Sequence, residues 1–191
     1  MNTGTITFVT GNANKAKHAS RLLGYPVVNY DMDLPEIQSL DLREVVEAKL
    51  KSAYEILKKP LIVEDVSLEF CELKRLPGTF IKFFVKELGL DYLCGMLDKK
   101  DKTAIAKCMI GFTDGTDTHL FLGAQSGKIT AEPRGDAGFG WDRIFVSDQF
   151  PGKTNAELDE VEYAKYFTAI RRFDSLKDYL STSGETNGTS I

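Results

Sequence analysis

The sequence predicts an α/β fold in which a mixed central sheet is flanked by helices. Its first half alternates β-branched or aromatic runs with amphipathic runs, beginning with residues 5–10 (TITFVT) and a helix pattern over residues 14–23. A hairpin is expected in the middle, where residues 103–113 and 118–124 flank an Asp-Gly turn. Strand–helix alternation favours parallel pairing and a hairpin requires antiparallel pairing, so one sheet should contain both.

The other elements follow from local periodicity and from residues that end helices. Residues 41–58 form the clearest helix, because an apolar stripe runs along one face and Pro60 follows it. Shorter elements complete the pattern, with strands at 27–30, 61–63, 128–131 and 144–146 and helices at 80–88, 92–97 and 162–180.

One domain should cover residues 1–180. A chain of 191 residues, 42 % of them hydrophobic, can bury most of its apolar surface around one core. Residues 181–191 (STSGETNGTSI) are small and mostly polar, so we expect them to form a disordered tail.

Composition argues against several classes of partner. The net charge of −4 disfavours DNA or RNA, because proteins that bind those polymers usually carry a basic excess. The three cysteines have no CxxC spacing and the two histidines lie far apart, which disfavours a disulfide framework or a zinc site. No apolar run approaches the ~20 residues of a membrane span, and the first residues do not resemble a signal peptide. We therefore expect a cytoplasmic enzyme that binds neither a nucleic acid polymer nor a membrane.

The segment TFVTGNANKAK, residues 7–17, predicts a strand that turns into a helix. Free N–H groups and the positive end of the helix dipole bind anions at such a turn, and Lys15 adds a full charge. The spacing is not that of a Walker A motif. Taken alone, the segment more often forms an ordinary strand-to-helix turn with a solvated lysine.

Carboxylates follow predicted strands or turns at four points, namely Glu36, Glu64, Asp65 and Asp142. Magnesium prefers such oxygen ligands, and an open α/β sheet places its ligand cleft at the carboxyl ends of strands. A solvated turn residue is the simpler interpretation for any one of these acids. Asp65 differs, because a charge at the end of a buried strand needs a partner or a cleft.

Aromatic residues and two lysines are further candidates. Residues 138–142 (GFGWD) place two glycines beside two aromatic rings, which suits the close approach of a flat ligand. A core tryptophan with glycines packed beneath it is an equally good interpretation. Lys49 and Lys82 lie on predicted helices, and Lys82 stands among apolar residues, which is less typical of a free surface.

Together these segments resemble the inosine triphosphate pyrophosphatase family, also called the Ham1 family. The motifs that carry the resemblance are FVTGNANKAK (8–17), DLPEIQ (33–38), LIVED (61–65), LPGTFIKFF (76–84), FGWD (139–142) and TNAEL (154–158). FGWD matches the family motif as it stands. The others are similar to the family elements (T/S)xNxxK, DLPExQ, VEDT or DDS, LPGxYIKWF and TYAEM, and the resemblance covers residues 5–180.

The resemblance implies a fold and a reaction. The family fold is an elongated α/β protein with two lobes around a central cleft, usually a homodimer. The reaction is magnesium-dependent hydrolysis of the purine nucleoside triphosphates ITP, dITP and XTP, in which water attacks the α-phosphorus and pyrophosphate leaves from the nucleoside monophosphate.

The resemblance also implies roles for individual residues. Those that bind the triphosphate are Thr10, Gly11, Asn12, Lys15, Lys49 and Lys82. Those that line the base and sugar end are Phe139, Gly140, Trp141 and Asp142. Glu36 and Asp65 are the implied Mg²⁺ ligands, and Asp65 and Lys15 the implied catalytic residues, with Asp65 accepting a proton from the attacking water.

The C-terminal helix departs from the family pattern. Family members carry a lysine and then a Ser-His-Arg triplet that binds the 6-keto oxygen of the purine, whereas this chain has Tyr163 and then residues 167–169 (FTA). Phe and Ala side chains cannot donate hydrogen bonds. Arg171 and Arg172 lie nearby, but a shift of two or three residues along a helix turns them to another part of its surface. We therefore assign no base-reading residue in this helix.

This departure leaves three hypotheses open. The chain is an active triphosphate pyrophosphatase, as its lysines and acids favour. Alternatively, it hydrolyses triphosphates with relaxed or altered base specificity, because lost hydrogen-bond donors weaken discrimination. As a third possibility, it binds nucleotides with little turnover, because misalignment alone can cost ~100-fold in rate.

Overall fold

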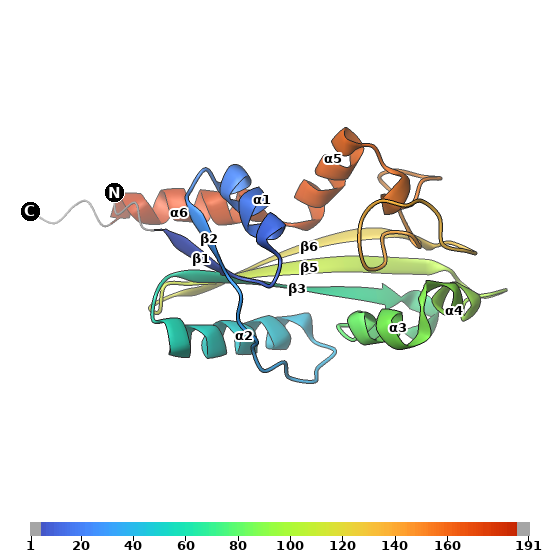
Figure 1. Ribbon diagram of the computed structural model, residues 1–191, viewed down its shortest axis with the longest axis horizontal. Coiled ribbons are helices and arrows are strands. Elements are labelled where there is room, and N and C mark those ends of the chain that lie inside the picture. Colours follow the sequence, from blue (N-terminus) through green and yellow to red (C-terminus); the bar gives the residue numbers. More distant parts are fainter. Residues whose placement is uncertain (1–4, 187–191) are drawn as a thin grey trace, which may run out of the picture.

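A seven-stranded sheet forms the centre of the protein in the computed structural model, which describes residues 5–186 (Figure 1). The strands are β1 (Ile6–Val9), β2 (Val27–Tyr30), β3 (Leu61–Phe70), β4 (Pro77–Gly78), β5 (Thr103–Thr113), β6 (Thr118–Ile129) and β7 (Phe145–Ser147). Their order is β2-β1-β3-β5-β6-β7, with β4 paired to β3. β1 pairs in parallel with β2 and β3, and the other pairs are antiparallel. The predicted mixed α/β sheet is confirmed.

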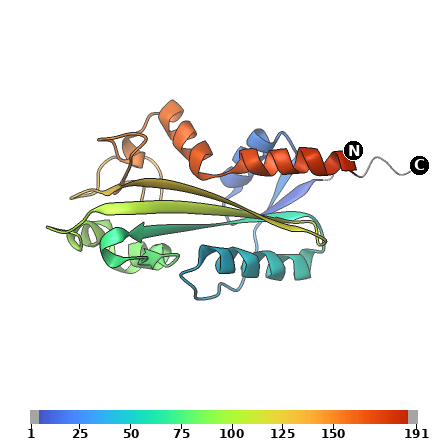
Figure 2. The same cartoon turned by 180° about the vertical axis from the view of Figure 1, so that it is seen from behind.

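Helices cover both faces of this sheet. Helices α1 (Ala13–Leu23) and α6 (Phe173–Thr186) lie over one face, and α2 (Leu42–Leu57) lies over the other (Figure 1). Helices α3 (Ile81–Leu88), α4 (Leu90–Gly95) and α5 (Glu160–Ile170) surround the opposite end of the long strands, as the reverse view also shows (Figure 2). Two short 3₁₀ turns, Cys71–Leu73 and Asn155–Glu157, complete the structure of residues 5–186.

The apolar core has separate parts at the two ends of the sheet. At one end, α1 and α6 bury Phe8, Leu23 and Phe173 on one face, and α2 buries Val46 and Leu50 on the other. At the far end, a separate cluster joins side chains such as Phe70, Leu93, Ile129, Phe145 and Tyr166. Strands β3 and β5 contribute to both parts, so they connect two lobes across one continuous ladder.

The C-terminal segment differs from the single helix expected over residues 162–180. Helix α5 ends at Ile170, and Arg171 takes an extended conformation with φ −104° and ψ 100°. The N–H of Arg171 still donates to the carbonyl of Phe167, and the chain re-enters a helix at Phe173. A continuous helix was expected to turn Arg171 to another part of its surface than residues 167–169. Because the helix ends at Ile170, that expectation does not apply to Arg171.

The first part of the segment expected to be a disordered tail, residues 181–191, is helical. Helix α6 continues to Thr186, and the hydroxyls of Ser181 and Thr182 donate to carbonyls one turn back, which satisfies these polar side chains within the helix. Residues 187–191 lie outside the described part of the chain. Within residues 5–186, no helix combines the length and the apolar content that crossing a bilayer requires.

Gly123 in β6 allows the end of α5 to approach the sheet. A methyl group at this position would overlap the backbone carbonyl of Ile170. We expect Gly123→Ala to lower the free energy of unfolding by about 1–3 kcal/mol through overpacking. Urea denaturation would measure the loss.

Gly95→Ala is the matched control for this substitution. No neighbouring atom lies within 4 Å of the methyl group that it would add at the end of α4. It should leave stability within about 0.5 kcal/mol of wild type or raise it slightly. An equal loss in both variants would contradict the close approach at Gly123.

Candidate functional site

A cleft of ≈830 Å³ opens beside β3, where β1 ends. β1 pairs with β3 only at Leu61 and Ile62, and the short strand β4 pairs with β3 again from Leu68. The intervening edge of β3 therefore faces the cleft. The wall contains Thr10, Gly11, Lys15, Glu36, Lys49, Asp65, Lys82 and Trp141, which come from six separate segments of the chain.

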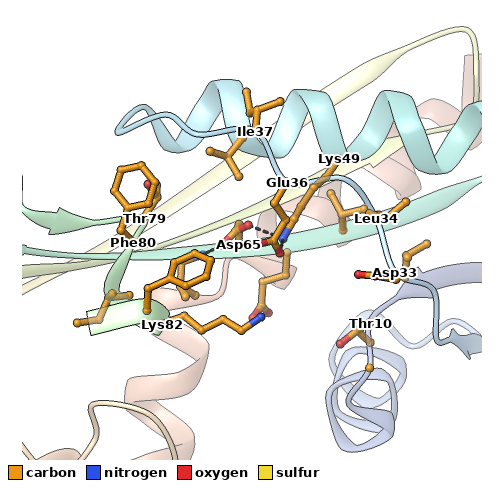
Figure 3. A pocket seen from close by; sticks show the side chains of 18 of the residues that line it. Thr10, Asp33, Leu34, Glu36, Ile37, Lys49, Asp65, Thr79, Phe80 and Lys82 are labelled. Atoms are coloured by element: carbon orange, nitrogen blue, oxygen red, sulfur yellow. Dashed lines mark hydrogen bonds and ion pairs between the residues drawn. The ribbon is translucent and has the colours of Figure 1, made fainter. Parts of the chain in front are cut away.

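The ammonium of Lys49 joins the two carboxylates that were expected to bind a metal. Its Nζ lies 2.8 Å from Glu36 Oε1 and 2.5 Å from Asp65 Oδ2, and Figure 3 shows the three side chains together within the cleft. Burial alone would lower the pKa of Lys49, but Asp65 and Glu36 more than offset it and raise the pKa above 10.5. Lys49 is therefore a fully charged cation between two acids.

The same geometry fits a divalent cation. Glu36 and Asp65 converge on one positive charge, and the Val66 N–H donates to Asp65 Oδ1 at 2.7 Å, which fixes the carboxylate. Within residues 5–186, no group of three or more His, Cys, Asp or Glu side chains could hold a metal by itself. Magnesium commonly takes one or two carboxylates and completes its coordination with water and substrate phosphate.

A second ionic cluster lies at the same edge of β3, and the sequence predicted only part of it. Glu64 is 2 % exposed at its side chain and accepts from Lys15 Nζ at 2.9 Å and from Arg171 Nε at 3.1 Å. Burial would raise the pKa of Glu64, but the charges of Arg171 and Lys15 outweigh it and lower the pKa from 4.5 to about 2. Glu64 is thus ionised between two cations.

The sequence contained a signal for this cluster. Consecutive residues of a strand point to opposite faces of the sheet, so Glu64 and Asp65 cannot face the same helices. Asp65 contacts Lys49 of α2, while Glu64 contacts Lys15 of α1 and Arg171 after α5. A buried acid at position 64 requires its own cation. The break of the C-terminal helix, which delivers Arg171, had no such signal.

The FGWD segment forms part of the wall of a small second cavity of ≈40 Å³. Phe139, Trp141 and Asp142 line it together with Tyr163 and Arg171. Lys15, Val66 and Trp141 line both this cavity and the main cleft, so the two are adjacent.

Asp142 holds the FGWD turn together. Its carboxylate accepts from the Phe139 N–H at 2.9 Å, the Tyr163 hydroxyl at 3.2 Å and the Asn155 amide at 3.3 Å. Burial raises the pKa of Asp142 despite these donors. Gly138, at φ +77°, could not carry a side chain here because a Cβ would lie 2.5 Å from Asp142 Oδ2.

Two of the predicted site residues line neither cavity. Asn12 is exposed, and its N–H donates to Thr10 Oγ1 at 3.2 Å just before α1. Gly140 is exposed and has a positive φ of 62°. The structure therefore gathers most of the predicted residues around the cleft and its small neighbour, and leaves these two at the rim.

Comparisons of sequence and of fold find known proteins that are similar to this chain. A sequence model of the Ham1 family matches residues 6–179. An inosine triphosphate pyrophosphatase of Scheffersomyces stipitis is 42 % identical over 92 % of this chain and 97 % of its own length, and one of Kluyveromyces lactis is 40 % identical over 94 % and 97 %. The solved structure of the Staphylococcus aureus Ham1 protein superposes with a TM-score of 0.81 at 24 % identity, over 94 % of this chain and 100 % of that one, which confirms the fold.

Glu64→Gln should destabilise the protein strongly. Removing the charge leaves Lys15 and Arg171 without their shared anion, and breaking a buried ion pair costs about 3–5 kcal/mol. The exposed Glu47, paired with Arg43 on α2, provides the control, and Glu47→Gln should cost under about 1 kcal/mol. Denaturation curves of both variants would measure the difference.

The stability of the wild-type protein should also depend on pH through Glu64. Its pKa is depressed in the folded state, so the stabilisation is complete above the unfolded value of 4.5 and is lost as the pH falls toward 2. In Glu64→Gln this part of the acid dependence should disappear. Identical acid-unfolding slopes in the two proteins would contradict the assignment.

Proposed function

The chain belongs to the Ham1 family, and on that premise we propose that it hydrolyses the purine nucleoside triphosphates ITP, dITP and XTP to the monophosphate and pyrophosphate. The family match confirms the resemblance carried by the sequence motifs. The observation that best supports this activity is the joint presence of lysines and paired carboxylates in one cleft. Such a site can bind a highly charged metal–triphosphate complex and seat its metal.

We assign the triphosphate to the side of the cleft formed by the turn after β1 and the facing lysines. Thr10, Gly11 and Lys15 lie at that turn, where helix α1 begins, and Asn12 extends it to the rim. Lys49 and Lys82 face it from α2 and α3. Free N–H groups at a helix start and converging ammonium groups together spread the negative charge of the phosphates.

Mg²⁺ is the cofactor that the donor set favours, with Glu36 and Asp65 as its protein ligands. A bound ion of this kind neutralises phosphate charge and polarises the bond that breaks.

Asp65 takes a proton from water, and the water oxygen forms a bond to the α-phosphorus. The bond to the bridging oxygen then breaks, and its electron pair leaves with pyrophosphate. The assignment of Phe139, Gly140, Trp141 and Asp142 to the base and sugar end completes the proposed site.

A homodimer in the cytoplasm is the assembly and location that the family resemblance favours. Light scattering coupled to size-exclusion chromatography would test the dimer directly.

Asp65→Asn should lower kcat for ITP by about 100-fold or more, because it removes the proposed proton acceptor and weakens the metal site. Lys82→Ala should instead raise KM, and no ion pair of Lys82 is recorded within residues 5–186, so its loss should not harm the fold. Pyrophosphate release in the presence of magnesium would be measured for each.

Lys17→Ala, an exposed change on α1, is the control for these variants and should behave as wild type. Full activity of Asp65→Asn would overturn its role. Tight ITP binding without hydrolysis by the wild-type protein would instead favour the nucleotide-binding alternative.

Lys49 should compete with the metal when no nucleotide is present. It must leave Glu36 and Asp65 when a divalent ion binds, and a phosphate can then take its charge. We expect Lys49→Met to bind Mn²⁺ about tenfold more tightly than wild type without nucleotide, and to bind pyrophosphate more weakly. Calorimetry would measure both, and unchanged Mn²⁺ affinity would contradict the competition.

A further inference from the structure

Arg171 occupies a position that the sequence pattern did not assign. The residue is 5 % exposed, its Nε donates to Glu64, and its guanidinium carbon lies 4.0 Å above the ring of Phe167. A buried arginine is costly unless its charge is paired, so the fold is built around this side chain. It lines the small cavity beside the main cleft.

The residues that replace the family's base-reading groups support Arg171 in this position. Phe167 stands where the resemblance places a serine, and its ring packs under the guanidinium. Tyr163 stands where it places a lysine, and its hydroxyl donates to Asp142 in the same cavity. These substitutions therefore replace the family's base-reading groups at both positions, and the ring of Phe167 at the same time supports the guanidinium of Arg171.

Hydrogen-bond donors remain available in this region. Glu64 accepts from Nε of Arg171, and within residues 5–186 no protein acceptor is recorded for its two terminal nitrogens. The indole nitrogen of Trp141 is buried and likewise has no partner among these residues. Trp141 lines both cavities and Arg171 lines the small one, so both side chains lie where the small cavity adjoins the main cleft. A buried donor without an acceptor, such as the Trp141 indole nitrogen, points to an absent ligand that has an acceptor.

We propose that Arg171, positioned by Glu64 and Phe167, reads the 6-oxygen of the purine base. The inference rests on the proposed triphosphate hydrolysis. A cavity of ≈40 Å³ takes the edge of a ring and not the whole ring, and Phe139, 55 % exposed at the cavity wall, can cover the rest. A 6-oxygen accepts from a guanidinium, whereas the 6-amino group of adenine would place donors against donors. The base preference is thus kept by a different residue and is not relaxed.

The direct test compares one substrate that has the 6-oxygen with one that lacks it and, with it, the proton on N1. The wild-type protein is assayed with ITP and with purine riboside triphosphate, which carries hydrogen in place of the oxygen. We expect kcat/KM to be about 10–100-fold higher for ITP, because a charged hydrogen-bond donor loses its partner in the analogue. Equal values for the two substrates would overturn the inference while leaving the proposed hydrolysis intact.

Variants then assign the preference to Arg171. In Arg171→Met the ratio of kcat/KM for the two substrates should fall below about 3-fold, and in Arg171→Lys it should be intermediate, because charge is kept and the planar donor is lost. Arg172→Met is the matched control, since Arg172 pairs with Asp174 on the outside of α6, and it should keep the wild-type ratio. An unchanged ratio in a folded Arg171 variant would overturn the inference.

Binding measurements separate this inference from the activity. The affinities of IMP and purine riboside monophosphate for the wild-type protein are compared by calorimetry, which needs no turnover. Tighter binding of IMP by about tenfold or more supports the base contact even if no triphosphate is hydrolysed, a result that would defeat only the proposed function. Equal affinities count against Arg171 as the base-reading residue.

Discussion

The buried carboxylate of Glu64 is the interaction on which the arrangement of the site depends. It holds Lys15 at the start of α1 and Arg171 at the end of α5, two residues that come from opposite ends of the chain. Desolvating three charges is costly, and the arrangement is stable only while all three are present. One acid thereby ties the phosphate side of the cleft to the small cavity beside it.

The sequence predicted the fold because its signals were local and mutually consistent. The hairpin of β5 and β6, the helix α2 and the strand leading to Asp65 all followed from periodicity and turn residues. The family resemblance then assigned Glu36, Lys49 and Asp65 to one site, and in the structure both acids lie within hydrogen-bond distance of Lys49.

The part that could not be predicted lies where tertiary contacts override a helical pattern. Residues 162–180 have the periodicity of one helix, yet the pairing of Arg171 with Glu64, 107 positions away, coincides with a break at Arg171. No local signal reports such a pairing. The same break changes the interpretation of Phe167, which in the sequence was only a lost donor and in the structure is the support of a new one.

The alternation of Glu64 and Asp65 on β3 has a consequence for how this protein can evolve. Their side chains serve different faces of the sheet, and the ten-residue pairing of β3 with β5 fixes which face each one meets. Inserting or deleting one residue upstream in the strand would move each carboxylate to the opposite face of the sheet. Lys49 would then lose its ion pair with Asp65, and Arg171 would lose its ion pair with Glu64. A substitution of either acid therefore disturbs one ionic cluster, whereas a change of length in β3 disturbs both.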